Sequence, residues 1–114
     1  MKSDVHPSIM KKNIFENIPE KIPEEVFETI ISVPGVTIER IVSKGHASPG
    51  DFWYDQAKNE WVIVLKGHAL LTFFEGAKSV DLKPGDYIKI PAHCMHRVEW
   101  TDPDAATIWL AIHY

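Results

Sequence analysis

From residue 36 to its end the chain consists of short β-rich segments separated by turn residues, and this pattern most constrains its fold. The expected strands are 36–42, 52–54, 60–66, 68–74, 78–82, 87–90, 97–100 and 107–113. Turn residues recur at about the eight- to twelve-residue spacing of sandwiches and barrels. None of these segments has helical periodicity, so the pattern predicts a sandwich or closed barrel rather than alternating strands and helices.

The part of the chain before these strands has a different character. Residues 1–13 are polar and are expected to form a flexible N-terminal tail. Residues 14–35 are interpreted as an extended lead-in followed by a short helix. Pro23 suits the first position of a helix, and the two glutamates after it suit the first turn. Apolar residues then recur at helical spacing until Gly35, so the barrel is expected over 36–114.

Composition narrows the class of protein. The chain has 114 residues and a formal net charge of −4, which suits one domain and argues against binding nucleic acid. Cys94 is its only cysteine, so it forms no intrachain disulfide, as is usual in a reducing compartment. No apolar run reaches the ~18 residues of a membrane span, and the first residues lack the apolar core of a signal peptide. We therefore expect a cytoplasmic protein without a membrane contact.

Two spaced motifs occur in the predicted barrel. Glu60 and Gly67 are separated by six residues, and Gly85 is followed at fixed spacing by Pro91 and His96. These spacings resemble the two motifs of the cupin superfamily, and the resemblance covers residues 36–114. It implies an all-β double-stranded β-helix, or jelly-roll barrel, closed around one internal pocket. Here a histidine at 93 and a tryptophan at 100 replace the family's usual glycine and asparagine.

The chain departs from the family at the first motif. The family holds a metal with three histidines and one glutamate, and two of these histidines precede the glutamate. The matching positions here are Tyr54 and Gln56, or Trp53 and Asp55 with the longer family spacing. Neither alignment supplies a histidine. The resemblance therefore implies the fold and the pocket more firmly than it implies a reaction.

Strand alternation suggests which polar residues meet. If Glu60 and His96 both point inward, they converge in one pocket together with Gln56. An oxygen-rich set with one imidazole suits a borderline divalent ion such as Mn, Fe, Ni or Zn. The alternative is a hydrogen-bonded polar cluster without metal, which is stable when each buried member is paired.

Other residues near this set are candidates for catalysis or ligand binding. Tyr54 and His93 are candidate proton-transfer groups, and Trp53 and Trp100 could wall a pocket for a small ligand. Each has a structural alternative: the aromatic residues belong to the core, and His93 only fills the turn before its strand. His113 is expected more readily as a core or surface residue than as part of the pocket.

Two functions remain open on this reading. The first is a metal-assisted enzyme acting on a small molecule by isomerisation, epimerisation or dioxygenation. The second is a non-catalytic cupin that binds a small ligand without metal. Trp61, Ile63 and Leu65 form a second apolar face of one strand, which favours a homodimer, although the N-terminal helix of a monomer could cover the same face.

Overall fold

The computed structural model describes residues 9–114, so residues 1–8 of the tail expected over residues 1–13 lie outside this range. The elements are β1 (Val26–Val33), β2 (Val36–Ser43), β3 (Glu60–Lys66), β4 (Ala69–Phe73), η1 (Glu75–Ala77), β5 (Lys78–Leu82), β6 (Tyr87–Ile90), β7 (His96–Thr101) and β8 (Thr107–His113). In the described part of the chain η1 is the sole helical element, and no helix has the length and hydrophobicity that crossing a membrane requires.

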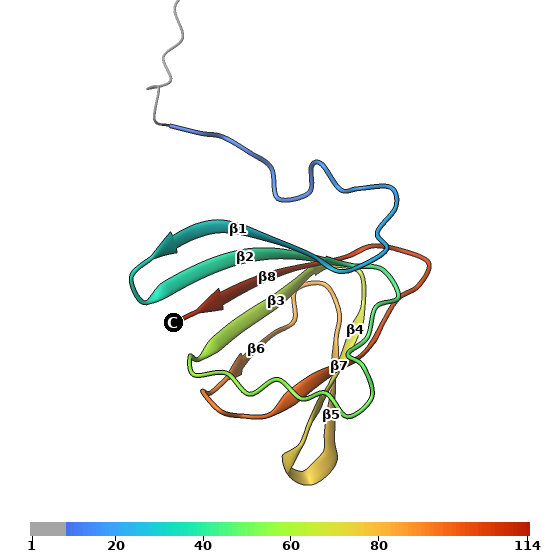
Figure 1. Cartoon of the computed structure of the whole chain (residues 1–114). Helices are drawn as coiled ribbons and strands as arrows, with labels where there is room; N and C mark the ends of the chain where they lie inside the picture. Colours follow the sequence, from blue (N-terminus) through green and yellow to red (C-terminus); the bar gives the residue numbers. More distant parts are fainter. Residues whose placement is uncertain (1–8) are drawn as a thin grey trace, which may run out of the picture.

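The strands form two antiparallel sheets that face each other (Figure 1). The larger sheet has the order β1-β2-β8-β3-β6, and the smaller has the order β5-β4-β7. Buried side chains from both sheets pack between them, among them Val62, Val64, Leu71 and Trp109. This arrangement confirms the predicted all-β jelly roll.

The predicted N-terminal helix is wrong, because residues 26–33 form strand β1 instead. β1 pairs along its length with β2, from Val26 opposite Val42 to Val33 opposite Val36. The two residues between the strands are a proline and Gly35, whose φ of +84° suits a tight turn. The β-branched residues of this segment gain more from pairing with β2 than from local helical spacing, which is a weak preference that tertiary context overrides.

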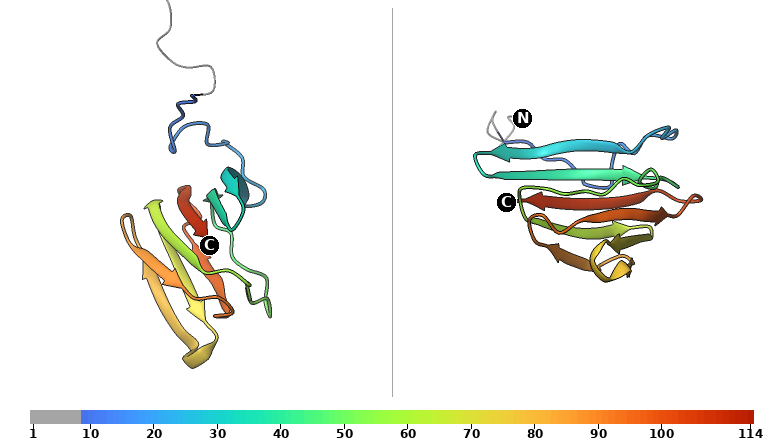
Figure 2. Two further views of the ribbon diagram at one scale, coloured as in Figure 1. Left: turned by 90° about the vertical axis from the view of Figure 1, so that its left-hand side faces the viewer. Right: turned by 60° about the horizontal axis from the view of Figure 1, so that its bottom comes forward.

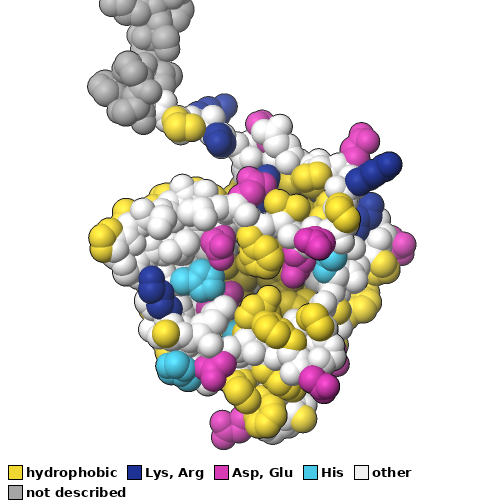
Figure 3. Space-filling model, in the orientation of Figure 1, with side chains coloured by type: hydrophobic (Ala, Val, Ile, Leu, Met, Phe, Trp, Pro, Cys, Tyr) yellow, Lys and Arg dark blue, Asp and Glu magenta, His cyan; other side chains and the backbone are white. Residues whose placement is uncertain are grey.

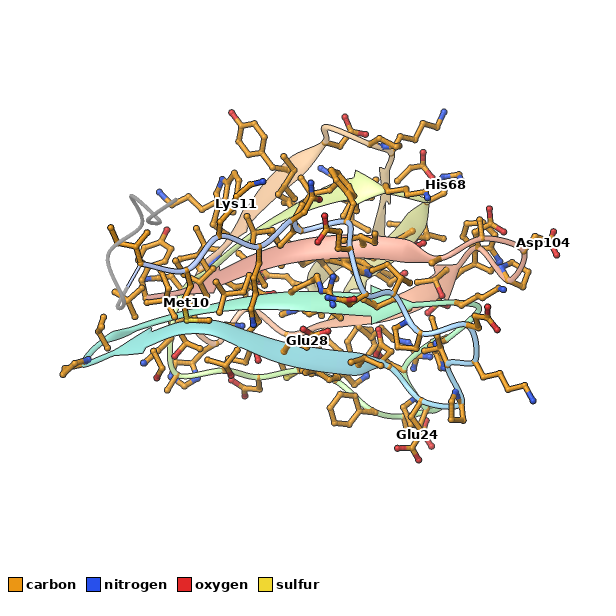
Figure 4. All side chains as sticks on the ribbon, turned by 90° about the horizontal axis from the view of Figure 1, so that it is seen from above. Met10, Lys11, Glu24, Glu28, His68 and Asp104 are labelled. Carbon is orange, nitrogen blue, oxygen red and sulfur yellow. The ribbon has the colours of Figure 1, made fainter. Side chains whose placement is uncertain are left out.

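The segment before β1 is held against the outer face of the larger sheet. Arg40 on β2 is 5% exposed and donates hydrogen bonds to the carbonyl oxygens of Ile14 (3.0 Å), Glu16 (2.6 Å) and Asn17 (3.4 Å). It also pairs with the Glu28 carboxylate on β1. Figure 4 looks down on this face and shows the N-terminal coil crossing it. One buried guanidinium thus fixes the coil to the sheet.

The connection between β3 and β4 passes very close to β8. Gly67 has a φ of +94°, and a Cβ atom there would lie 2.5 Å from the Cα and 2.4 Å from the Oγ1 of Thr107. Such distances are far shorter than atoms tolerate. The glycine of the first motif is therefore required by backbone approach as well as by backbone conformation.

We expect Gly67→Ala to destabilise the fold much more than Gly35→Ala. Both glycines have positive φ, but an added Cβ at Gly35 meets no atom within 4 Å. The Gly35 variant should lose about 1–2 kcal/mol of unfolding free energy from conformation alone. The Gly67 variant should lose about 2 kcal/mol more, because its methyl group overlaps backbone. Urea denaturation measures both values, and equal losses would contradict the close approach.

Candidate functional site

A cavity of about 80 Å³ lies between the inner faces of the two sheets. Its apolar wall is made by side chains of both sheets, which are Phe27, Ile41, Val62, Leu71, Ile90, Val98 and Trp109. Its polar wall is made by Glu25, Glu39, Tyr54, Gln56, Glu60, His96 and His113. The cavity is small compared with drug-sized pockets, which are typically about 300–1,000 Å³. It suits a compact ligand.

Strand register explains why the polar residues meet. Glu60 begins β3 and lies directly opposite His113 of β8, so both side chains leave the same face of the larger sheet. His96 begins β7 in the smaller sheet and faces them across the interior. Its Nε2 atom is 3.5 Å from Glu60 Oε1, and the two residues are 5% and 8% exposed. The Glu60 carboxylate and the His96 imidazole therefore face each other inside the barrel.

Backbone contacts fix the His96 ring and its tautomer. His96 Nδ1 lies 2.8 Å from the carbonyl oxygen of Cys94, and because a carbonyl only accepts hydrogen bonds, Nδ1 carries the proton. Nε2 is thus the atom that faces Glu60 and the cavity. Tyr54 exchanges two backbone hydrogen bonds with His96, of 2.7 and 3.1 Å, and its ring stacks on the imidazole with centroids 5.4 Å apart.

The surroundings shift the pKa of both aromatic groups. Burial lowers the pKa of His96, but contact with the Glu60 carboxylate, the hydrogen bond to Cys94 and the charge of Glu60 together raise it above its ordinary value. Burial also raises the pKa of the Tyr54 phenol, and the charges of Glu25, Glu60 and Glu39 raise it further. Tyr54 therefore stays protonated at neutral pH and can donate a hydrogen bond.

A second histidine–carboxylate pair lines the same cavity. His113 Nε2 lies 3.0 Å from Glu39 Oε1, and both side chains are about four-fifths buried, at 18% and 21% exposure. Sequence reasoning did not place His113 in the pocket. One signal was available, because His113 alternates with Trp109 and Ala111 and so shares their face of β8. The pairing of β2 with β8, which brings Glu39 beside His113, is a long-range feature that the local sequence does not reveal.

Of the residues expected in the site, Tyr54, Gln56, Glu60 and His96 come together around the cavity. Trp53 and His93 are not among its described lining residues. Trp53 packs edge-on against Phe74, with ring centroids 5.2 Å apart. The His93 side chain is 69% exposed and pairs with Asp55 at 2.8 Å. His93 also has a φ of +60°, a backbone conformation that glycine adopts more readily.

Trp100 also lies away from the cavity, because β7 contains a β-bulge. Val98 pairs with Leu71 and Trp100 pairs with Leu70, which leaves Glu99 as the extra residue. One extra residue reverses the side-chain alternation beyond it. Trp100 is therefore 41% exposed on the outer face, where it packs against His68. The expectation that Trp100 walls the pocket is therefore wrong, because side-chain alternation from His96 holds only as far as Val98.

The donor atoms around the cavity differ from the three histidines and one glutamate implied by the resemblance. Among residues 9–114 no group of three histidine, cysteine, aspartate or glutamate residues is arranged to hold an ion. Glu60 and His96 face each other, and the donors beside them are the Tyr54 phenol and the Gln56 amide. A protonated phenol and a neutral amide are weaker ligands than imidazole nitrogen.

The fold and the pocket between its sheets define a small single-barrel jelly roll. A comparison with protein-family models matches the Cupin domain over residues 39–113. The chain therefore belongs to the cupin family. A comparison with curated proteins gave no match.

Solved structures agree with this assignment. A protein from Ralstonia eutropha JMP134, named a "putative mannose-6-phosphate isomerase", is 42% identical, with 92% of this chain and 97% of that chain covered and a TM-score of 0.89. A cupin superfamily protein from Desulfitobacterium hafniense DCB-2 is 20% identical, with 84% and 82% covered and a TM-score of 0.69. Fe(II) HppE with its substrate is 17% identical, with 78% and 53% covered and a TM-score of 0.65. The last two share the fold.

We expect the stability contribution of His96 to fall as pH rises. Because its pKa is raised in the folded state, the contribution is complete below the unfolded value of about 6.5 and is lost as pH passes through the folded value. Urea unfolding of the wild type and of Glu60→Gln at a series of pH values measures this contribution. The stability advantage of the wild type over Glu60→Gln should be largest at low pH and should be lost as pH rises through the folded pKa of His96. A difference between wild type and variant that does not change with pH would contradict the coupling.

Proposed function

We propose that this cupin performs proton-transfer chemistry on a compact molecule bound in the barrel. The observation that carries the proposal is the presence of two histidine–carboxylate pairs, His96–Glu60 and His113–Glu39, on one largely apolar cavity. A histidine held by a carboxylate is suited to general acid–base catalysis because its pKa lies near the operating pH. Two such groups can remove a proton and return one elsewhere.

The His96 tautomer suits this role. With Nδ1 donating to the Cys94 carbonyl, the neutral ring presents the Nε2 lone pair to the cavity, where it can take a proton from a bound molecule. The resulting imidazolium is stabilised by Glu60. The protonated Tyr54 phenol beside it can hydrogen-bond to a substrate oxygen that gains negative charge. These are the elements of isomerisation or epimerisation.

The comparison with the Ralstonia eutropha protein supports the same reaction class. Its printed name describes an isomerase, and it is similar to this chain over nearly the whole length of both. Isomerases of carbonyl compounds move a proton between neighbouring atoms, which needs an acid and a base on one site.

The proposal predicts solvent exchange at carbon. In D2O, the protein should exchange an α-hydrogen of at least one compound in a mixture of small ketones, aldehydes and hydroxy acids, read by proton NMR. His96→Asn and His113→Asn should each lower the rate about 100-fold or more. His68→Asn is the matched control, because His68 pairs with Asp81 outside the cavity. Ligand binding without exchange would instead favour the non-catalytic binding protein that the sequence also suggests.

A divalent ion on Glu60, His96 and Gln56 is the second candidate. The observation that favours it is the fixed His96 ring, because metal-binding histidines commonly donate their other nitrogen to a carbonyl. The fold is also that of Fe(II) HppE, although the low identity extends the likeness to the fold alone. Elemental analysis separates the candidates. Acid–base chemistry predicts that metal-free protein exchanges the α-hydrogen. Stoichiometric Mn, Fe, Ni or Zn in the wild type that is lost in Glu60→Ala and His96→Ala would instead favour the metal site.

We also propose that the protein is a homodimer that pairs through β1. β1 is the edge strand of that sheet, as the right-hand view of Figure 2 makes visible. Its side chains Phe27, Ile30, Ile31 and Val33 are 47–53% exposed. A long apolar edge strand is a template for pairing with another chain. A second copy of the chain paired with β1 would cover these apolar side chains and the open sheet edge.

Sedimentation tests the dimer. At concentrations on the order of tens of micromolar the wild-type protein should sediment with the mass of two chains, and Ile31→Asp should shift it toward one chain. Glu75→Lys on η1 is the control for a change of charge away from β1. A single-chain mass for the wild type would overturn the proposal.

The remaining expectations concern the cell. The acidic isoelectric point of about 5.8 supports a protein without a nucleic-acid partner. The single cysteine supports the cytoplasm. Both stay predictions, which localisation of a tagged copy and a nucleic-acid binding assay would test.

A further inference from the structure

The charge of the cavity wall is strongly one-sided. Glu25, Glu39 and Glu60 line it, and among its described lining residues there is no lysine or arginine. On the face seen in Figure 3, hydrophobic side chains gather at the centre, with carboxylates and histidines around them and lysine and arginine toward the margins. The cavity therefore offers oxygen acceptors and two titratable imidazoles, but no permanent positive charge.

Arg40 and Arg97 are held by contacts outside the cavity. Arg40 neighbours Glu39 in sequence, but alternation along β2 sends it to the outer face, where it holds Glu28 and the N-terminal coil. Arg97 neighbours His96 in the same way and pairs with Glu99 at 2.9 Å, while also donating to backbone carbonyls. Neither reaches the cavity without breaking these contacts.

The carboxylates act on the cavity together. Glu25, Glu60 and Glu39 each raise the pKa of the Tyr54 phenol, which reports a negative potential at that side chain. Glu25 is also held in place, because Ser43 donates to it at 2.5 Å and the indole of Trp109 donates to Ser43 at 3.1 Å. An anionic ligand would be repelled here.

The apolar wall adds a second property. Phe27, Tyr54 and Trp109 place three aromatic rings on the cavity. Aromatic faces attract cations, and most strongly where water is excluded. Carboxylates and aromatic rings around one cavity match a positively charged nitrogen with an apolar body.

We propose that the cavity binds a compact organic cation, a protonated or quaternary amine with apolar substituents. This inference rests on the proposed function, because it names the substrate class of the same site. A phosphate ester, such as the substrate in the name of the Ralstonia eutropha protein, would meet three carboxylates and none of the arginine or lysine groups that usually bind phosphate.

Probes of similar size and different charge test the proposal. Trimethylammonium, isopropanol, acetate and inorganic phosphate are titrated into the full-length protein, and binding is followed by backbone amide NMR shifts. Trimethylammonium should perturb the amides around the cavity and bind about tenfold or more tightly than isopropanol. Acetate and phosphate should leave these amides unchanged.

Charge-neutralising variants locate the effect. Glu25→Gln and Glu39→Gln should each weaken trimethylammonium binding about threefold to tenfold and leave isopropanol binding unchanged. Glu99→Gln, on the outer face, should change neither. Each variant's NMR spectrum reports whether it is folded, and Glu25→Gln retains the acceptor oxygen that Ser43 uses.

The outcomes separate this inference from the proposed function. Binding of isopropanol, acetate or phosphate in the cavity as tight as that of trimethylammonium would overturn the cation inference and leave the pocket as a ligand site. Absence of cavity binding by every probe would overturn both. Trimethylammonium binding that Glu25→Gln and Glu39→Gln do not weaken would also overturn the inference, since its charge selectivity would then come from elsewhere.

Discussion

The pairing of β3 with β8, and the packing of β7 across from them, place a carboxylate and an imidazole in the interior of the barrel. An unpaired carboxylate in such a place costs several kcal/mol, and so does an unpaired imidazolium. Glu60 and His96 are almost fully buried and lie 3.5 Å apart, so each compensates the other. The interior tolerates polar chemistry only because this pair, and the His113–Glu39 pair beside it, are formed. The apolar side chains of the lining make the surroundings of these pairs less polar than water, which strengthens the interactions.

The proposed proton transfer and the proposed preference for a cation both rest on this arrangement. We propose that the two pairs exchange protons with a bound molecule and that the three carboxylates favour a positively charged one. Tyr54 and Gln56 line the same cavity and contribute a phenol and an amide to it. The protonated phenol supplies a hydrogen-bond donor beside the His96 ring.

The sequence predicts the all-β jelly roll well, because turn residues and alternation are local features. The alternation of side chains along a strand also puts Glu60 and His96 on inward-facing positions. This alternation is broken at a β-bulge, and the extra residue Glu99 turns Trp100 outward. Long-range pairing is harder still. The segment ending at Val33 has helical spacing, yet it pairs with β2, and His113 enters the site through a neighbour on another strand.

Histidine side-chain nitrogen NMR tests the central claim, the contact between Glu60 and His96, most directly. A pH titration of the wild type should show Nδ1 of His96 protonated throughout and Nε2 titrating with a pKa above the ordinary value of about 6.5. In Glu60→Gln that pKa should fall, because burial then acts without the carboxylate. A His96 pKa that is ordinary in the wild type and unchanged in Glu60→Gln would contradict the account.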